Sequence, residues 1–276
     1  MAKKSYPNSD LKHQKWIKEG RGGGHGQDYK PWLTIRDVPS EGRSHRIFGH
    51  KCQRTHHLLS DLELAVFFIL EWHKDTIDIR EQFPLRIDDT RAIAGEAQIK
   101  HPGVRGMLHI MSSDFLVDTH DPQRPKFSLQ AKYSDALQDT QTVEKLEIER
   151  RYWTQKSVPW MLVTEKEIPI VVFQNIAWLY PKEKRKELDL EVMQERVPIY
   201  AHHFQKFPRK TIVEIAILLD AAYSLPQGQS LSEIGELLAN RCFLFDIFVP
   251  YLQLKGGELQ SENIVTMSEV LRVSNQ

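Results

Sequence analysis

The chain has 276 residues, with 37 Lys and Arg against 37 Asp and Glu, and hydrophobic residues make up 41% of it. This length corresponds to about two domains of roughly 100–200 residues, and the composition is globular, which excludes intrinsic disorder. The two cysteines, Cys52 and Cys242, exclude a disulfide framework and a four-cysteine zinc site. The longest apolar run, Leu64 to Leu70, is too short to cross a membrane, and the polar N-terminus lacks a signal region, so we expect a cytoplasmic protein.

The balanced charge conceals a basic N-terminal arm. Residues 1–60 carry 12 Lys and Arg against 5 Asp and Glu, together with six histidines. A basic arm ahead of a more acidic middle region is typical of a protein that binds phosphates and holds metal ions nearby. A solvated basic surface is the alternative interpretation.

The first predicted element is a short helix over Ser9–Glu19, ended by the glycines between Gly20 and Gly24. This glycine run lacks the Lys and Ser/Thr of a phosphate-binding P-loop, which indicates a linker. Residues 29–57, rich in Pro, Gly and basic residues, are predicted to be mostly loop. A core helix then begins at Ser60, which has Glu63 at the spacing of a capping box.

An α/β pattern follows this helix. Alternating residues predict a strand over Thr76–Phe83, and two further strands are expected at Asp114–Val117 and Phe127–Ala131. A long charged helix over Ser134–Lys156 leads to Val158–Val163, whose continuous hydrophobicity favours a strand with a parallel neighbour.

Beyond Thr164 the chain is predicted to be mostly helical. The expected helices span 171–180, 182–195, 210–224 and 231–240, and short strands are expected at 243–249 and 264–267. Two helices joined by a turn and followed by strands are typical of a winged-helix domain, although other small helical domains have the same order. We therefore predict domains at residues 1–166 and 167–276.

Three predicted strand positions carry side chains suited to phosphodiester cleavage. Because side chains alternate along a strand, Gln130 and Lys132 project to one face, and pairing of the strands would bring Asp114 beside them. Glu63, near the start of the core helix, supplies a second carboxylate. Oxygen ligands for Mg²⁺ and a cation for the phosphate are the groups that such chemistry requires. By spacing alone, a turn-capping Asp114 and a solvated Lys132 are the simpler interpretation.

Several other polar residues have candidate roles. The histidine pairs 56–57 and 202–203 and Cys52 lack the spacing of a structural zinc site, so no histidine-based zinc site is predicted. Glu81 and Glu149 are candidates for supporting carboxylates, although Glu149 is more simply part of a solvated salt-bridged helix face. The loop from 43 to 57 is a candidate DNA-binding segment through Arg43, His45, Arg46, Lys51, Arg54, His56 and His57.

The pattern Glu63, Asp114, Gln130-Ala131-Lys132 resembles the active site of the restriction-endonuclease-like superfamily, and specifically of the TnsA family. Further segments across residues 15–180 are similar to that family. They are Lys18–Gly22, Gly24–Gly26, Pro31–Thr34, Gly42–Arg46, His56–Glu63, Asp78–Leu85, Ser113–Asp118 and Glu149–Trp153. The superfamily usually has Asp or Glu where Gln130 stands, and an amide is the weaker metal ligand.

The resemblance implies an N-terminal nuclease domain with a mixed central sheet flanked by helices, and a mostly helical, winged-helix-like C-terminal domain for DNA or partner binding. Glu63, Asp114, Gln130 and the Ala131 carbonyl would hold Mg²⁺, with Mn²⁺ able to substitute, and Lys132 would act on water or phosphate. The implied partners are transposon-end DNA, a TnsB-type transposase that cuts the opposite strand, and a TnsC-type ATPase regulator. The implied activity is single-strand cleavage at the 5′ ends of a bacterial transposon, on nucleoid DNA.

Two alternative functions are open at this point. A freestanding repair or junction nuclease would cut DNA without a partner and would need no docking surface in its C-terminal third. A non-catalytic assembly module would keep the fold without the chemistry, but Asp114 and Lys132 are both present.

Overall fold

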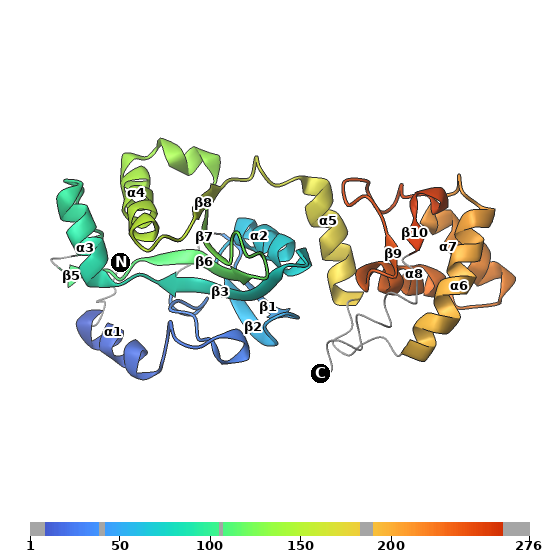
Figure 1. Ribbon diagram of the computed structural model, residues 1–276, viewed down its shortest axis with the longest axis horizontal. Coiled ribbons are helices and arrows are strands. Elements are labelled where there is room, and N and C mark those ends of the chain that lie inside the picture. The colour runs from blue at the N-terminus through green and yellow to red at the C-terminus, as the bar shows by residue number, and fades with distance from the viewer. Residues whose placement is uncertain (1–8, 39–41, 105–106, 183–189, 262–276) are drawn as a thin grey trace, which may run out of the picture. The chain divides into compact units, whose positions relative to one another are not determined.

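The computed structural model describes residues 9–38, 42–104, 107–182 and 190–261, and the chain divides into two compact units, Met1–Ile168 and Pro169–Gln276. The first unit alternates helices and strands (Figure 1). Its elements are α1 (Ser9–Lys18), β1 (His45–Gly49), β2 (Arg54–Leu58), α2 (Asp61–Trp72), β3 (Thr76–Pro84), α3 (Ile87–Glu96), β4 (Gly103–Val104), β5 (Met107–Leu108), β6 (Ser112–Thr119), β7 (Lys126–Ala131), α4 (Thr140–Gln155) and β8 (Trp160–Val163).

A four-stranded sheet in the order β3-β6-β7-β8 forms the centre of this unit. The pairs β3–β6 and β6–β7 are antiparallel, whereas β7 and β8 are parallel. Parallel neighbours need a long crossover connection, and α4 provides it between β7 and β8. The predicted mixed sheet with flanking helices is therefore confirmed for the N-terminal unit, as is the parallel neighbour expected for its last strand.

Apolar side chains from the sheet and the helices form the core of the unit. Phe67 of α2 and Phe115 of β6 are completely buried, as is Ile148 of α4. Leu85, Ile93 and Leu116 pack with Ile148 in one cluster, which joins α3, β6 and α4. Burial of each such side chain stabilises the fold by about 1.5–3 kcal/mol, and this fixes the ends of β6 and β7 relative to the helices.

The prediction of loop for residues 29–57 is wrong from His45 onward, where β1 and β2 form an antiparallel hairpin beside α2 (Figure 1). The inward positions of β2 hold Arg54, His56 and Leu58, all buried, with exposed Thr55 between the first two. Because two of the three inward side chains are polar, the hydrophobic alternation that signals a strand is absent. Helix α3 lies between the first two predicted strands, in a segment for which no element is predicted from the sequence.

The second unit is mostly helical, with α5 (Ile170–Leu179), α6 (Leu190–Lys206), α7 (Ile212–Ala222), α8 (Gln229–Ala239) and two short antiparallel strands, β9 (Phe243–Leu244) and β10 (Gln260–Ser261). Thr211 caps α7 in a capping box with Glu214. The expected strand at 264–267 and residues 183–189 of the expected second helix lie outside the described residues. Within the described part of the chain, no helix is long and apolar enough to span a membrane.

Candidate nuclease site

Helix α2 fixes Glu63 in its first turn. The Ser60 hydroxyl oxygen accepts a hydrogen bond from the Glu63 backbone N–H at 3.0 Å, which is the N-cap expected from the sequence. The Glu63 carboxylate turns back to the cap, where Oε2 accepts from the Leu59 N–H at 2.9 Å and Oε1 accepts from the Ser60 hydroxyl at 3.1 Å. Only 6% of Glu63 is exposed, so its side chain is held inside the domain rather than in solvent.

Strands β6 and β7 bring Asp114 to the same place. Its backbone N–H donates to Gln130 Oε1 at 3.0 Å, and its Oδ2 accepts from the Ala131 N–H at 2.8 Å. Lys132 follows β7 directly, and its Nζ lies 3.7 Å from Asp114 Oδ2. Thus the structure brings Asp114, Gln130 and Lys132 together, with the N–H of Ala131 rather than its carbonyl bonded to Asp114.

Gln82 of β3 joins the two carboxylates and was not singled out in the sequence. Its Nε2 makes long hydrogen bonds to Glu63 Oε2 at 3.3 Å and to Asp114 Oδ1 at 3.4 Å, while Ser112 donates to its Oε1. The backbone of Gln82 has φ 49°, in the left-handed region that costs a non-glycine residue about 1–2 kcal/mol. This conformation interrupts the strand pairing and directs the amide at both acids. Neither composition nor strand periodicity signals such a residue.

The burial of two neighbouring carboxylates sets the electrostatics of the cluster. Burial, reinforced by the charge of Asp114, raises the pKa of Glu63 to about 8. Burial alone would lower the pKa of Lys132, but the negative charges of Asp114, Glu63 and Glu149 outweigh it and raise that pKa. The site therefore carries one firmly protonated amine beside a carboxyl group whose ionised form is costly.

The solvated interpretation of Glu149 is wrong. Glu149 is buried and accepts a hydrogen bond of 2.6 Å from the Ser113 hydroxyl, and burial raises its pKa to about 8. Its neighbour Glu147 instead pairs with Arg150 and Arg151 on the surface of α4. This turn of α4 therefore carries the ion-paired Glu147 on its surface and the buried Glu149 next to β6, the strand of Asp114.

The predicted DNA-binding residues divide into exposed and buried groups. Arg43 and Arg46 are exposed, whereas His45, Lys51 and His57 are partly buried. His45 bonds to Asp61 at 2.7 Å, the Lys51 ammonium donates to the Thr76 carbonyl at 2.9 Å, and burial lowers the pKa of His57.

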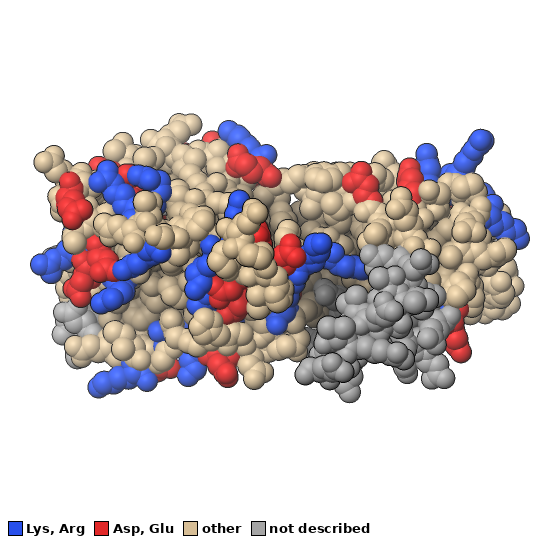
Figure 2. Space-filling model, in the orientation of Figure 1, with Lys and Arg blue, Asp and Glu red and all other residues tan. Residues whose placement is uncertain are grey.

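Arg54 and His56, the two remaining candidates for DNA contact, have a structural role in this unit. Both are buried and bind the completely buried carboxylate of Glu81, with His56 Nδ1 lying 2.9 Å from its Oε2. Glu81 therefore supports the hairpin and not the nuclease cluster. On the face drawn in Figure 2, basic and acidic side chains are interspersed, so that face offers no large described area of one sign.

Comparison with known proteins defines the class of the molecule as an endonuclease. Residues 73–165 match the family described as TnsA-like endonuclease N terminal, and residues 167–247 match TnsA endonuclease C terminal. The chain is also 49% identical over 275 residues, with 100% of both chains covered, to the transposon Tn7 transposition protein TnsA of Escherichia coli. The chain therefore belongs to the TnsA family and is an endonuclease of DNA transposition.

The raised pKa of Glu63 predicts that the metal-free protein loses stability as the pH rises from about 5 to 8. Folded Glu63 keeps its proton toward pH 8, whereas the unfolded chain releases it near the ordinary value of 4.5, so in this window the folded state binds more protons and rising pH favours unfolding. Glu63→Gln should reduce the dependence of the free energy of unfolding on pH, measured by urea denaturation in chelator, and buried Glu149, whose pKa is also raised to about 8, accounts for a remaining slope of the same sign. Glu147→Gln is the control, and an equally steep slope in Glu63→Gln would contradict the prediction.

The left-handed backbone of Gln82 predicts a difference between two variants that both lack the amide. Gln82→Gly accepts φ 49° without strain, whereas Gln82→Ala keeps the Cβ that disfavours it, so Gln82→Gly should be more stable by about 1 kcal/mol. Denaturant midpoints of the metal-free variants measure this difference. Equal midpoints, or a more stable Gln82→Ala, would show that Gln82 is unstrained.

Proposed function

We propose that Glu63, Asp114, Gln130 and Lys132 form the active site of a Mg²⁺-dependent nuclease that cuts one strand at the 5′ ends of a transposon. The convergence of a buried carboxylate pair and a lysine at the ends of β6 and β7 supports this most directly. Family membership supports the DNA substrate. Cleavage of the other strand would fall to a TnsB-type transposase, under control of a TnsC-type ATPase.

The cluster fits a hard divalent cation. The Glu63 and Asp114 carboxylates lie on either side of one donor, the Gln82 amide nitrogen, at 3.3 and 3.4 Å, so both acids face the same small region. Mg²⁺ prefers oxygen ligands and commonly takes one or two protein carboxylates, and Mn²⁺ accepts the same set. A positive charge there would also relieve the repulsion that raises the pKa of Glu63. The residues that would hold the ion are Glu63 and Asp114, with Gln130 and the Ala131 carbonyl as further oxygen donors.

Each protein group has a separate task in this scheme. A divalent ion bound at the site would acidify the attacking water and neutralise charge on the phosphate. Lys132 keeps its proton because three acids surround it, so it acts as a fixed positive charge for the phosphate or orients the water. Gln130 holds the Asp114 backbone, and the Ala131 N–H keeps one Asp114 oxygen turned toward Lys132.

The exposed side chains of Arg43 and Arg46 are the strongest DNA-contact candidates in the N-terminal unit, with partly buried His45, Lys51 and His57 as weaker ones. Phosphate contacts by such side chains position the duplex without reading its sequence.

We propose that the mostly helical C-terminal unit is winged-helix-like and binds DNA or a partner protein, as the resemblance to the TnsA family implies. Helix α8 has no Lys or Arg, and its acids Glu233 and Glu236 pair with Arg196 within the unit.

Strand-resolved cleavage of end-labelled transposon DNA in Mg²⁺, with the partner transposase present, tests the proposal. Asp114→Ala should lower the rate of the 5′-end cut at least about a hundredfold, because loss of a cation-binding acid costs several kcal/mol, while the 3′-end cut persists. Asp88→Ala, an exposed acid at the start of α3, is the control and should cut normally. Survival of both cuts in Asp114→Ala would favour the assembly-module interpretation, and partner-free cleavage by the wild type would favour a freestanding nuclease.

A further inference from the structure

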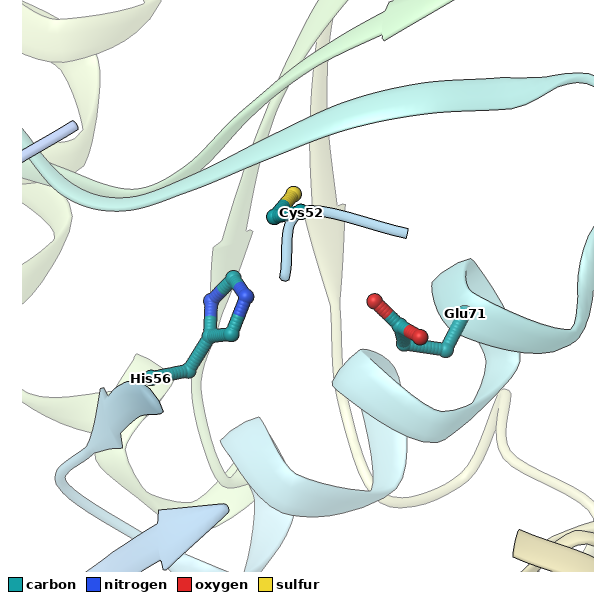
Figure 3. A group of neighbouring side chains, drawn as sticks. All are labelled: Cys52, His56 and Glu71. Atoms are coloured by element: carbon teal, nitrogen blue, oxygen red, sulfur yellow. The ribbon is translucent and has the colours of Figure 1, made fainter. Parts of the chain in front are cut away.

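A second cluster of ligand-type side chains lies between the β1–β2 hairpin and α2. Cys52 comes from the hairpin turn, His56 from β2 and Glu71 from the last turn of α2, and all three are buried (Figure 3). One atom from each, the thiol sulfur, a ring nitrogen and a carboxylate oxygen, lies within 4.8 Å of the others. The sequence spacing could not reveal this group, because the acid, Glu71, lies 15 residues beyond His56 in the chain and on a helix.

His56 is oriented as metal-binding histidines usually are. Its Nδ1 lies 2.9 Å from the Glu81 carboxylate, which two Arg54 nitrogens hold in turn. Its other ring nitrogen, Nε2, is buried and has no hydrogen-bond partner in the described structure, although His56 is 0% exposed. A carboxylate on one ring nitrogen fixes the ring and increases the basicity of the other, which is the usual support of a histidine ligand.

The other two side chains are also held in place. Glu71 Oε2 accepts from the backbone N–H groups of His50 at 2.9 Å and Lys51 at 3.3 Å, which anchors the carboxylate at the hairpin turn. The Cys52 sulfur accepts a hydrogen bond from the Ile79 N–H at 3.2 Å, and its thiol donates one to Asp78 Oδ1 at 3.4 Å. The backbone N–H groups at Glu71 and Cys52 favour the anionic forms that bind metal ions, whereas the Asp78 carboxylate favours the protonated thiol.

Gly49 leaves open the space next to these atoms. A Cβ at this position would lie 2.4 Å from His56 Nε2 and 3.1 Å from Glu71 Oε1. Gly49 ends strand β1, outside the left-handed region, so its backbone does not require glycine. The absence of a side chain is explained by the room that it leaves at the histidine nitrogen.

We propose that Cys52, His56 and Glu71 bind one Zn²⁺ ion, at a site separate from the nuclease cluster. A thiolate, an imidazole and a carboxylate are zinc ligands, whereas Mg²⁺ disfavours sulfur. Metal–ligand bonds of about 2.0–2.3 Å in a tetrahedron place ligand atoms roughly 3.4–3.7 Å apart, so side-chain movements of about 1 Å close the site.

Binding of the Zn²⁺ ion would release one proton, that of the Cys52 thiol. Before the ion arrives, the Cys52 thiol carries its hydrogen and donates it to Asp78 Oδ1 at 3.4 Å. On binding, the zinc–sulfur bond forms, the S–H bond breaks and the proton leaves to solvent, with no change of oxidation state. The ion would join the hairpin to the end of α2, the helix whose first turn carries Glu63. It would therefore act as a structural clamp.

Cobalt titration of the full-length, metal-stripped protein tests the site, because a thiolate ligand gives Co²⁺ a charge-transfer absorption that oxygen ligands do not. Wild type should show this band at one Co²⁺ per chain, and Zn²⁺ should abolish it. Cys52→Ser should lose the band, whereas Cys242→Ser, which changes the other buried cysteine, should keep it. Asp114→Ala should also keep it, which separates this site from the nuclease proposal.

A second variant distinguishes the loss of metal binding from a loss of folding. Glu71→Gln keeps the Cys52 thiol and the shape of the side chain but replaces an anionic ligand with an amide. It should weaken Zn²⁺ binding by about tenfold or more, measured in competition with a chromogenic chelator. Circular dichroism in chelator shows whether each variant is folded. A wild type without the band, or a band that persists in Cys52→Ser, would overturn the proposal and leave the cluster as a buried polar contact.

Discussion

The close approach of two buried carboxylates, Glu63 and Asp114, is the constraint on which the nuclease domain depends. Burial, reinforced by the charge of Asp114, makes the ionised form of Glu63 costly, and the positive charge of Lys132 offsets only part of that cost. A divalent cation at the cluster would lower the cost further. Stability is reduced at the place where the chemistry is proposed to occur.

Backbone groups of three separate elements hold this arrangement. The N-terminal cap of α2 binds the Glu63 carboxylate, and the Ala131 N–H at the end of β7 binds Asp114. The side-chain amide of Gln82, whose backbone departs from regular strand geometry within β3, lies between the two acids. The elements that carry these groups pack against one another, since α2 contacts both β3 and β7. The lysine follows from the same geometry, because β7 ends one residue before it.

The parts of the fold that follow hydrophobic periodicity could be predicted from the sequence. The α2 cap, the strands of the central sheet and the parallel position of β8 depend on local patterns of apolar residues and on Ser60. The β1–β2 hairpin could not be predicted, because Arg54 and His56 point inward and are neutralised by Glu81, which is distant in sequence. The contact of Gln82 with both acids could not be predicted either, because it depends on the backbone conformation of Gln82 and not on its residue type.

Binding of Mn²⁺ to the full-length protein, followed by electron paramagnetic resonance, tests most directly whether the carboxylate pair is a cation site. The account predicts that wild type and Cys52→Ser bind the ion alike, whereas Glu63→Gln and Asp114→Asn, which preserve the shapes of the side chains, each bind it much more weakly. Unchanged Mn²⁺ binding in both of these variants would contradict the account and remove the cation from the proposed nuclease site.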